Sequence, residues 1–388
     1  MSERIVKRNQ GEPSLLRDVF FVLAVFLLLR GALFGIVALG QNMVPERTDI
    51  ASGDFKAFPG HEFWDGWARW DSGWYSKIVE QGYSIKGPQS SVVFAPLYPA
   101  VIRAVNPIVG NHWVAGLIIS NLSFIVALLI ILRLARLYLN KTAARLTIVY
   151  LLIFPTSLFY SAYYSESLFL LWSSLSVYFY LKKRYFLTGL FGLFASLTRV
   201  VGIALFAAYI IGLVWQQKDK LKKITKEVLW VLLIPLGLIV FSIILHIQVG
   251  QPLAWLTYQS GWNGWDSSLV SFILSGSDGF MQIYNWQYLD IIVSAVLLVF
   301  FIFFITKLAK RQDIDKALPA YSIILVMLPF SNGSFISLAR YMVVAFPTFM
   351  MLADYSQRSG IANRLILFLS SALLVVYSVL FHNWYWVG

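Results

Sequence analysis

Long apolar runs, separated by short clusters of charged residues, recur along the whole chain. A helix needs about 20 apolar residues to cross the hydrocarbon core of a bilayer, and strand periodicity is missing from these runs. The pattern predicts an all-α polytopic integral membrane protein, one domain over residues 1–388 with about 11 transmembrane helices. The expected spans are 17–40, 113–134, 146–163, 166–181, 185–198, 201–216, 228–248, 286–307, 318–333, 335–353 and 362–381.

The basic residues predict the orientation of these spans, because cytoplasmic loops retain Lys and Arg. Placing the N-terminus in the cytoplasm puts 22 of the 31 basic residues on that side. Two long connections, the first outer loop (41–112) and a second outer loop (249–285), then lie outside. The formal charge of +12 is therefore mainly a topology signal, and we expect no nucleic-acid partner.

The stretch 185–215 is the hardest to assign, since only Arg199 interrupts its apolar run. The basic clusters at 182–184 and 218–226 both favour the cytoplasm. The stretch must therefore cross twice or re-enter the membrane, with a turn near Thr198 and Arg199. Two short helices and a re-entrant loop both remain open.

Composition removes several function classes. With 59% hydrophobic and 13% charged residues the chain cannot be a soluble enzyme. It has no Cys, its four His are scattered, and it carries no G-x-x-x-x-G-K-[ST] motif. Thiolate catalysis and a Walker-type ATPase are thereby excluded, and we expect neither a metal site nor a cofactor.

The first outer loop is rich in aromatic residues around Asp71. From Asp71, the pattern DSGWYSKIVEQGY places Trp74, Ile78 and Gln81 on one side, which predicts a short amphipathic helix in the membrane interface. A second short helix is expected between Pro96 and about Pro107.

Asp71 has two possible roles. It could cap the start of its helix, or it could act as a general base that takes the proton of an acceptor hydroxyl at the membrane surface. Asp65, six residues earlier, is expected to be a solvated loop acid.

Other polar groups inside apolar sequence also need explanations. Tyr160, Tyr163 and Tyr164 could form an interfacial tyrosine belt, with Ser165 capping a helix and Glu166 in its first turn. Arg199 and Arg340 each could bind a phosphate or form an ion pair, for Arg199 with Glu166. Arg30 is expected to be a structural partner of another polar group.

These segments in series resemble the PIG-V-like mannosyltransferases, a branch of the GT-C polytopic glycosyltransferases. The resemblance rests on six segments: ARWDSGWYSKIVEQGY at 68–83, FAPLYP at 94–99, FYSAYYSESLF at 159–169, SLTRVVG at 196–202, the Gln259/Trp262 pair, and SLARYMVVAFPTF at 337–349. The segment SLTRVVG departs from the R-S-N-G type of the eukaryotic members, and the plain outer loops suggest a prokaryotic member.

The resemblance implies a GT-C-type bundle with juxtamembrane helices in the first outer loop, which would be the catalytic loop. It also implies an inverting transfer of a sugar, mannose first of all, from a polyprenyl-phosphate (dolichyl-type) donor to a lipid- or glycan-linked acceptor. Asp71 would be the general base and Arg199 and Arg340 would bind the donor phosphate. The sugar or acceptor pocket would contain Trp70, Tyr163, Tyr164, Glu166, Gln259 and Trp262.

In this view the enzyme sits in the plasma membrane of a prokaryote, or in the ER membrane of a eukaryote, with its active site outside. The alternative is a transporter of lipids or glycolipids, or an assembly subunit without catalysis. Transporters tend to be built of repeated halves. We see no internal repeat, and the polar residues gather at one face.

Overall fold

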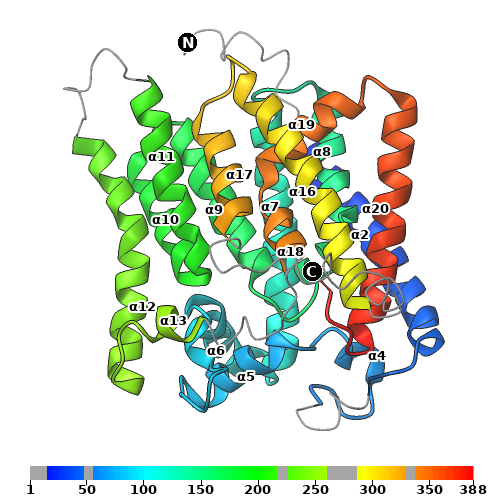
Figure 1. Cartoon of the computed structure of the whole chain (residues 1–388), viewed down its shortest axis with the longest axis vertical. Helices are drawn as coiled ribbons and strands as arrows, with labels where there is room; N and C mark the ends of the chain where they lie inside the picture. The colour runs from blue at the N-terminus through cyan, green and yellow to red at the C-terminus, as the bar shows by residue number, and fades with distance from the viewer. Residues whose placement is uncertain (1–14, 48–55, 217–225, 260–285, 329–336, 388) are drawn as a thin grey trace, which may run out of the picture.

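The computed structural model describes residues 15–47, 56–216, 226–259, 286–328 and 337–387 of the chain. Within these residues the regular elements are helices, and the longer ones run side by side as a bundle (Figure 1). Five helical stretches are long and apolar enough to cross a membrane: Leu15–Met43, His112–Arg136, Val228–Val249, Leu289–Lys310 and Gly360–His382. The predicted all-α membrane architecture is confirmed.

The outward surface of the long helices is apolar. On α2 (Leu15–Gly40) Phe20 is 76% exposed, and on α20 (Gly360–His382) Phe368 is 71% exposed. Large apolar side chains on the outside are unfavourable in water but suit contact with lipid. The bundle therefore presents a lipid-facing surface.

Close helix packing fixes the middle of the bundle. The helix α10 (Tyr185–Thr198) lies between α9 (Glu166–Leu181) and α12 (Leu233–Val249). A Cβ added at Gly192 would come within 2.5 Å of Ile234, so only glycine allows this approach. Small residues let membrane helices approach closely, and the contact fixes the end of α10 that carries Arg199.

The two juxtamembrane helices are confirmed. They are α5 (Asp71–Gln81) and α6 (Leu97–Val109), which pack on each other at one end of the bundle near α4 (Glu62–Asp65) and α13 (Ala254–Thr257) (Figure 1). The stretch 185–215 also forms two short helices, α10 and α11 (Ile203–Gln216), joined by a 3-10 turn at Val200–Gly202.

Two predicted spans are interrupted. The span 146–163 is wrong beyond Ile153, where α8 (Lys141–Ile153) ends and a short 3-10 helix at Ser157–Tyr160 follows. Phe154 has ψ 142 because it precedes Pro155, and a residue before proline avoids the helical region. The span 335–353 is likewise split into α18 (Leu338–Val343) and α19 (Phe346–Ser356), which has a proline in its first turn.

The remaining helices complete the bundle. They are α7 (His112–Arg136), α16 (Trp286–Lys310) and α17 (Ala317–Met327), the last of which covers only the first part of the predicted span 318–333. The rest of that span lies outside the described residues. After α20 the chain turns back toward α5, so that the C-terminal segment (Asn383–Val387) lies beside the first outer loop.

Candidate active site

Asp71 begins the juxtamembrane helix α5 and does not cap it. The capping position belongs to Trp70, and the helix start has no side-chain cap. Of the two roles considered for Asp71, the helix cap is therefore wrong. Its side chain, 13% exposed, instead points to Arg340, whose Nη1 lies 2.6 Å from Asp71 Oδ2.

Backbone strain accompanies both partners of this contact. Trp70 has φ 55 and ψ −115, and Ser337, directly before α18, has φ 65. Conformations of this kind cost about 1–3 kcal/mol each and tend to occur at functional sites. The conformations of Trp70 and Ser337 set the directions in which α5 and α18 begin. These directions bring Asp71 and Arg340 into contact.

Arg340 is buried and joins two acids. While its Nη1 binds Asp71, its Nε donates a hydrogen bond to Glu166 Oε1. The guanidinium also lies 4.7 Å from the ring centroid of Tyr164. A planar group of five donors suits such a bridge between two carboxylates.

Glu166 is fully buried at the start of α9, and Arg199 meets it from the turn between α10 and α11. The ion pair between Glu166 and Arg199, one of the two readings of the sequence, is thus confirmed. Two acids and two arginines form a cluster that we call the Asp71–Arg340–Glu166–Arg199 quartet. Its formal charges cancel, which is how buried charges become tolerable.

The second carboxylate oxygen of Glu166 is buried and lacks a hydrogen-bond partner among the described residues. Ser165 occupies the N-cap position of α9, as expected, but its side chain makes no capping hydrogen bond. Its Oγ instead lies 2.7 Å from the hydroxyl of Tyr75 and 3.4 Å from Arg199 Nη1. Burial, and next the charge of Glu166, raise the pKa of Tyr75 well above its ordinary value, so this hydroxyl stays protonated.

The predicted tyrosine belt is wrong, since Tyr160, Tyr163 and Tyr164 are completely buried. The chain leaves the helix at Pro155, which turns these side chains into the bundle. The hydroxyl of Tyr164 accepts a hydrogen bond of 3.2 Å from Asp71 N and donates one of 3.1 Å to Arg69 O. Tyr164 thereby holds the backbone at the start of α5 in place.

Asp65 is not a solvated loop acid. It is buried and lies 2.5 Å from Arg69 Nη1. Arg69 also donates from Nε to the carbonyl of His382 and lies 4.7 Å from the ring centroid of Trp384. The reason for the error is the tertiary role of Arg69, which pairs with Asp65 and also ties the first outer loop to the end of α20 and to Trp384.

The C-terminal segment supplies two aromatic rings that the sequence did not mark as functional. Trp70 packs edge to face against Trp384 and Trp386, at centroid distances of 5.8 and 5.4 Å. Trp386 also lies 6.0 Å from the guanidinium of Arg340. The indole nitrogens of Trp70 and Trp386 are buried without a partner among the described residues. The tryptophan pair in HNWYWV was the available signal, but the pattern cannot tell an interfacial anchor from a site wall.

The other predicted site residues lie elsewhere or are not described. The ring of Tyr163 packs against Trp113, and its backbone N–H donates to Trp67 O at 2.9 Å. Gln259 is half-buried just after α13, and Trp262 lies outside the described residues. Their pocket roles stay predictions. Arg30, by contrast, donates to Ser157 O at 2.9 Å, which confirms its structural role.

The described part of the chain contains no group of three His, Asp or Glu residues that could hold a metal ion. The site brings together a carboxylate at the start of a membrane-surface helix, a guanidinium that holds it, and the indole rings of Trp70 and Trp386. Such an acid can accept a proton, and the second arginine can meet an anion.

Solved structures of ArnT share this fold. ArnT from Cupriavidus metallidurans, bound to undecaprenyl phosphate, superposes with a TM-score of 0.53 at 13% identity, covering 92% of this chain and 75% of ArnT. The same protein in the apo state gives a TM-score of 0.52 at 14% identity and the same coverage. The oligosaccharyltransferase AglB from Archaeoglobus fulgidus gives 0.48 at 11% identity, covering 94% of this chain and 55% of AglB.

No curated protein matches the chain by sequence. The family model described as Mannosyltransferase (PIG-V), however, matches residues 19–263, well over half of the chain, including Asp71, Glu166 and Arg199. With its membrane-spanning helices and its GT-C fold, the chain therefore belongs to the PIG-V mannosyltransferase family and is an integral membrane glycosyltransferase.

Proposed function

We propose that this protein transfers a mannosyl group from a polyprenyl-phosphate donor to the hydroxyl of a lipid- or glycan-linked acceptor, with inversion. The observation that carries the proposal is the contact of Asp71 with Arg340 beside the Glu166–Arg199 pair. Family membership supports mannose as the sugar. The undecaprenyl phosphate bound to ArnT, which shares the fold, supports a polyprenyl-phosphate donor.

The reaction is a single displacement. Asp71 takes the proton of the acceptor hydroxyl while the oxygen attacks the anomeric carbon. The bond between that carbon and the phosphate oxygen breaks, and polyprenyl phosphate leaves with the bonding electrons. One displacement at the anomeric carbon inverts its configuration. The donor already carries the sugar on a phosphate leaving group, so that no cofactor is required.

The two arginines differ in how many of their N–H groups are already engaged in hydrogen bonds. Arg340 uses Nε on Glu166 and Nη1 on Asp71, whereas within the described residues Arg199 uses only Nη1, on Glu166 and Ser165. Arg199 therefore is the better candidate for the donor phosphate, because its remaining N–H groups can stabilise the charge that develops as the phosphate leaves. Arg340 contributes mainly by holding the Asp71 carboxylate in position.

The aromatic residues around Asp71 suit a sugar. Trp70 and Trp386 are half-buried, their indole N–H groups have no partner among the described residues, and Trp386 lies beside Arg340. Apolar ring faces pack against the C–H face of a pyranose, and an indole N–H can donate to a sugar hydroxyl. The first outer loop and the C-terminal segment together would thus form one wall of the glycosyl site.

The proposed site faces the non-cytoplasmic side, in keeping with the basic residues at the other end of the bundle. The plain outer loops favour the plasma membrane of a prokaryote. At that face a lipid-linked sugar can reach the site from within the bilayer. It serves as the glycosyl donor, so the reaction needs no nucleotide sugar.

The test is a donor panel on the purified chain. Radiolabelled mannose linked to polyprenyl phosphate should be transferred to a membrane-lipid extract, whereas GDP-mannose should not support transfer. Glucose on the same carrier measures sugar selectivity, and the anomeric configuration of the product reports inversion. Transfer from GDP-mannose alone, or a product with the donor's configuration, would refute the proposal.

A further inference from the structure

A polar pocket of about 710 Å³ lies at the end of the bundle opposite α5 and α6. The link between α7 and α8, the end of α16, and α19 with the turn after it surround the pocket. The lining residues are Tyr138, Leu139, Asn140, Lys307, Arg311, Met351, Asp354, Gln357 and Arg358. Its volume falls within the range of ligand-binding pockets.

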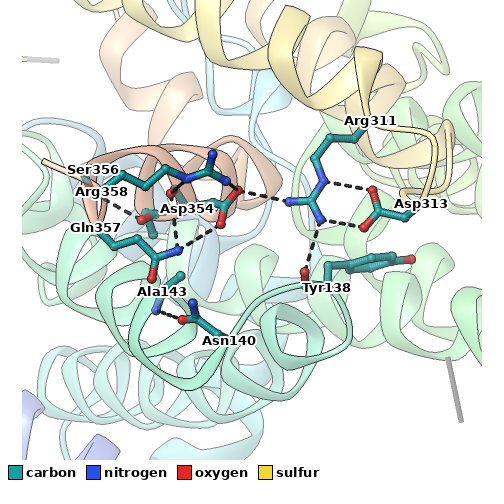
Figure 2. Close-up of polar contacts among 10 residues, drawn as sticks. Tyr138, Asn140, Ala143, Arg311, Asp313, Asp354, Ser356, Gln357 and Arg358 are labelled. Atoms are coloured by element: carbon teal, nitrogen blue, oxygen red, sulfur yellow. Dashed lines mark hydrogen bonds and ion pairs between the residues drawn. The ribbon is translucent and has the colours of Figure 1, made fainter. Parts of the chain in front are cut away.

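Asp354 organises one side of this pocket, as Figure 2 shows. Its carboxylate accepts hydrogen bonds from Arg311 at 3.3 Å, from Arg358 at 3.0 Å and from Gln357 at 3.0 Å. Arg311 is held further by Asp313, through contacts of 3.0 and 2.6 Å, and by the carbonyl of Tyr138. Both carboxylate oxygens of Asp354 thus accept hydrogen bonds, and Arg311 is held by Asp313, Asp354 and the Tyr138 carbonyl.

Two cations at the pocket keep donor capacity. Arg358 uses Nε and one terminal nitrogen on Asp354, and its side chain is 71% exposed. Lys307, on α16, forms no ion pair within the described residues and lies 5.2 Å from the ring centroid of Phe303. The lining thus carries three cations against one carboxylate, which favours an anionic ligand.

The surroundings of Lys307 indicate that this ligand is a lipid. Phe303 is 41% exposed and Tyr355 is 48% exposed, and their rings pack together where α16 meets α19. These exposed rings are next to the charged rim, so that a ligand can place an anionic group in the pocket and hydrocarbon along the helices. Basic pockets between transmembrane helices on the cytoplasmic side bind anionic head groups in this way.

We propose that this pocket binds the phosphate headgroup of an anionic phospholipid of the cytoplasmic leaflet, with Lys307 and Arg358 as the phosphate ligands. Arg311 and Asp354 position Arg358, and the seam of Phe303 and Tyr355 receives an acyl chain. The site is separate from the glycosyl site, at the other end of the bundle.

The test counts bound lipids on the full chain by native mass spectrometry in detergent. Phosphatidylglycerol is compared with phosphatidylcholine and with soluble glycerol 3-phosphate. The variant Lys307→Gln/Arg358→Gln removes two exposed cations, so its fold should persist. The control Lys182→Gln/Lys183→Gln removes two exposed cations from the same end of the bundle, just after α9 and outside the pocket lining.

We expect the affinity for phosphatidylglycerol to fall about tenfold in the pocket variant, since a hydrogen bond to a charged group contributes about 1.5–3 kcal/mol and 1.4 kcal/mol is a factor of ten. The control should stay within about twofold of the wild type on the same reasoning. Equal affinity of wild type and pocket variant would overturn the proposal. Binding of glycerol 3-phosphate as tight as that of the lipid would overturn the assignment to a lipid.

Discussion

At the scale of single residues, the quartet joins Asp71, Glu166, Arg199 and Arg340, which come from four separate segments of the chain. Each charge is stabilised by an opposite one, and a buried pair that loses one partner leaves an uncompensated charge costing about 3–5 kcal/mol. For each substitution in the quartet, both the melting temperature and the turnover rate must therefore be measured.

Asp71→Asn should preserve the fold and remove turnover. Asparagine keeps a side-chain oxygen that can accept the hydrogen bond from Arg340. The start of α5 should also be unaffected, because Asp71 is not its cap. Loss of a general base costs about 10²- to 10⁴-fold in rate. Turnover with the best donor of the panel and the melting temperature are measured on one preparation.

The matched control for Asp71→Asn is Glu80→Gln, an exposed acid on the same helix whose surface contact with His112 contributes little. Its rate should stay near that of the wild type. A near-native rate for Asp71→Asn would show that Asp71 is not the base.

Arg199→Lys distinguishes a phosphate ligand from a structural ion pair. Lysine keeps the charge opposite Glu166 but loses the planar set of donors. If Arg199 binds the donor phosphate, donor affinity should fall about tenfold, equivalent to about 1.4 kcal/mol, while the melting temperature changes little. Affinity is measured by titration with the polyprenyl-phosphate sugar.

The opposite result, early melting with unchanged donor affinity, would make Arg199 a purely structural partner of Glu166. The phosphate role would then pass to Arg340, whose Nη2 makes no hydrogen bond to the residues that the structure describes.

At the scale of elements, the turn between α10 and α11 carries Arg199 to Glu166. Gly202 ends this turn, and a Cβ there would lie 2.5 Å from Ser196 N and 2.6 Å from Ala195 C. Both are backbone atoms, so the turn itself would have to move.

Gly202→Ala should therefore lower the free energy of unfolding by about 1–3 kcal/mol and reduce turnover by displacing Arg199. Gly35→Ala on α2 is the control, because nothing lies within 4 Å of its added Cβ. Alanine there should be neutral or stabilise the helix by up to about 1 kcal/mol. Equal melting temperatures for the two variants would contradict the role given to the turn.

At the scale of the whole molecule, the two ends of the bundle differ in chemistry. The end with α5 and α6 carries the neutral quartet and many aromatic rings, whereas the other end carries the basic pocket around Asp354. This asymmetry agrees with the orientation expected from the basic residues.

The orientation can be tested directly, because the chain has no native cysteine. Gln89→Cys, exposed in the first outer loop, should react with an impermeant thiol reagent in intact cells. Lys310→Cys, exposed at the end of α16, should react only after the membrane is opened. The reverse pattern would invert the topology and place Asp71 in the cytoplasm.

Local sequence patterns determined much of this protein. The lipid-facing helices, the two juxtamembrane helices and the turn at Arg199 follow from apolar run length, periodicity and the cost of a charge in lipid. The same cost marked Asp71, Glu166, Arg199 and Arg340 as residues that need partners. These signals act within a few residues of the chain, so a single sequence contains them.

Only the tertiary structure decided which of these groups meet. Arg340 contacts Glu166, 174 residues away, and Asp71, 269 residues away, and Arg69 reaches His382 across 313 residues. Such pairings depend on how the helices pack, which no local pattern encodes. For the same reason the tyrosines of 160–164 proved buried, and the C-terminal tryptophans came to pack against Trp70, because distant segments meet at each of these positions.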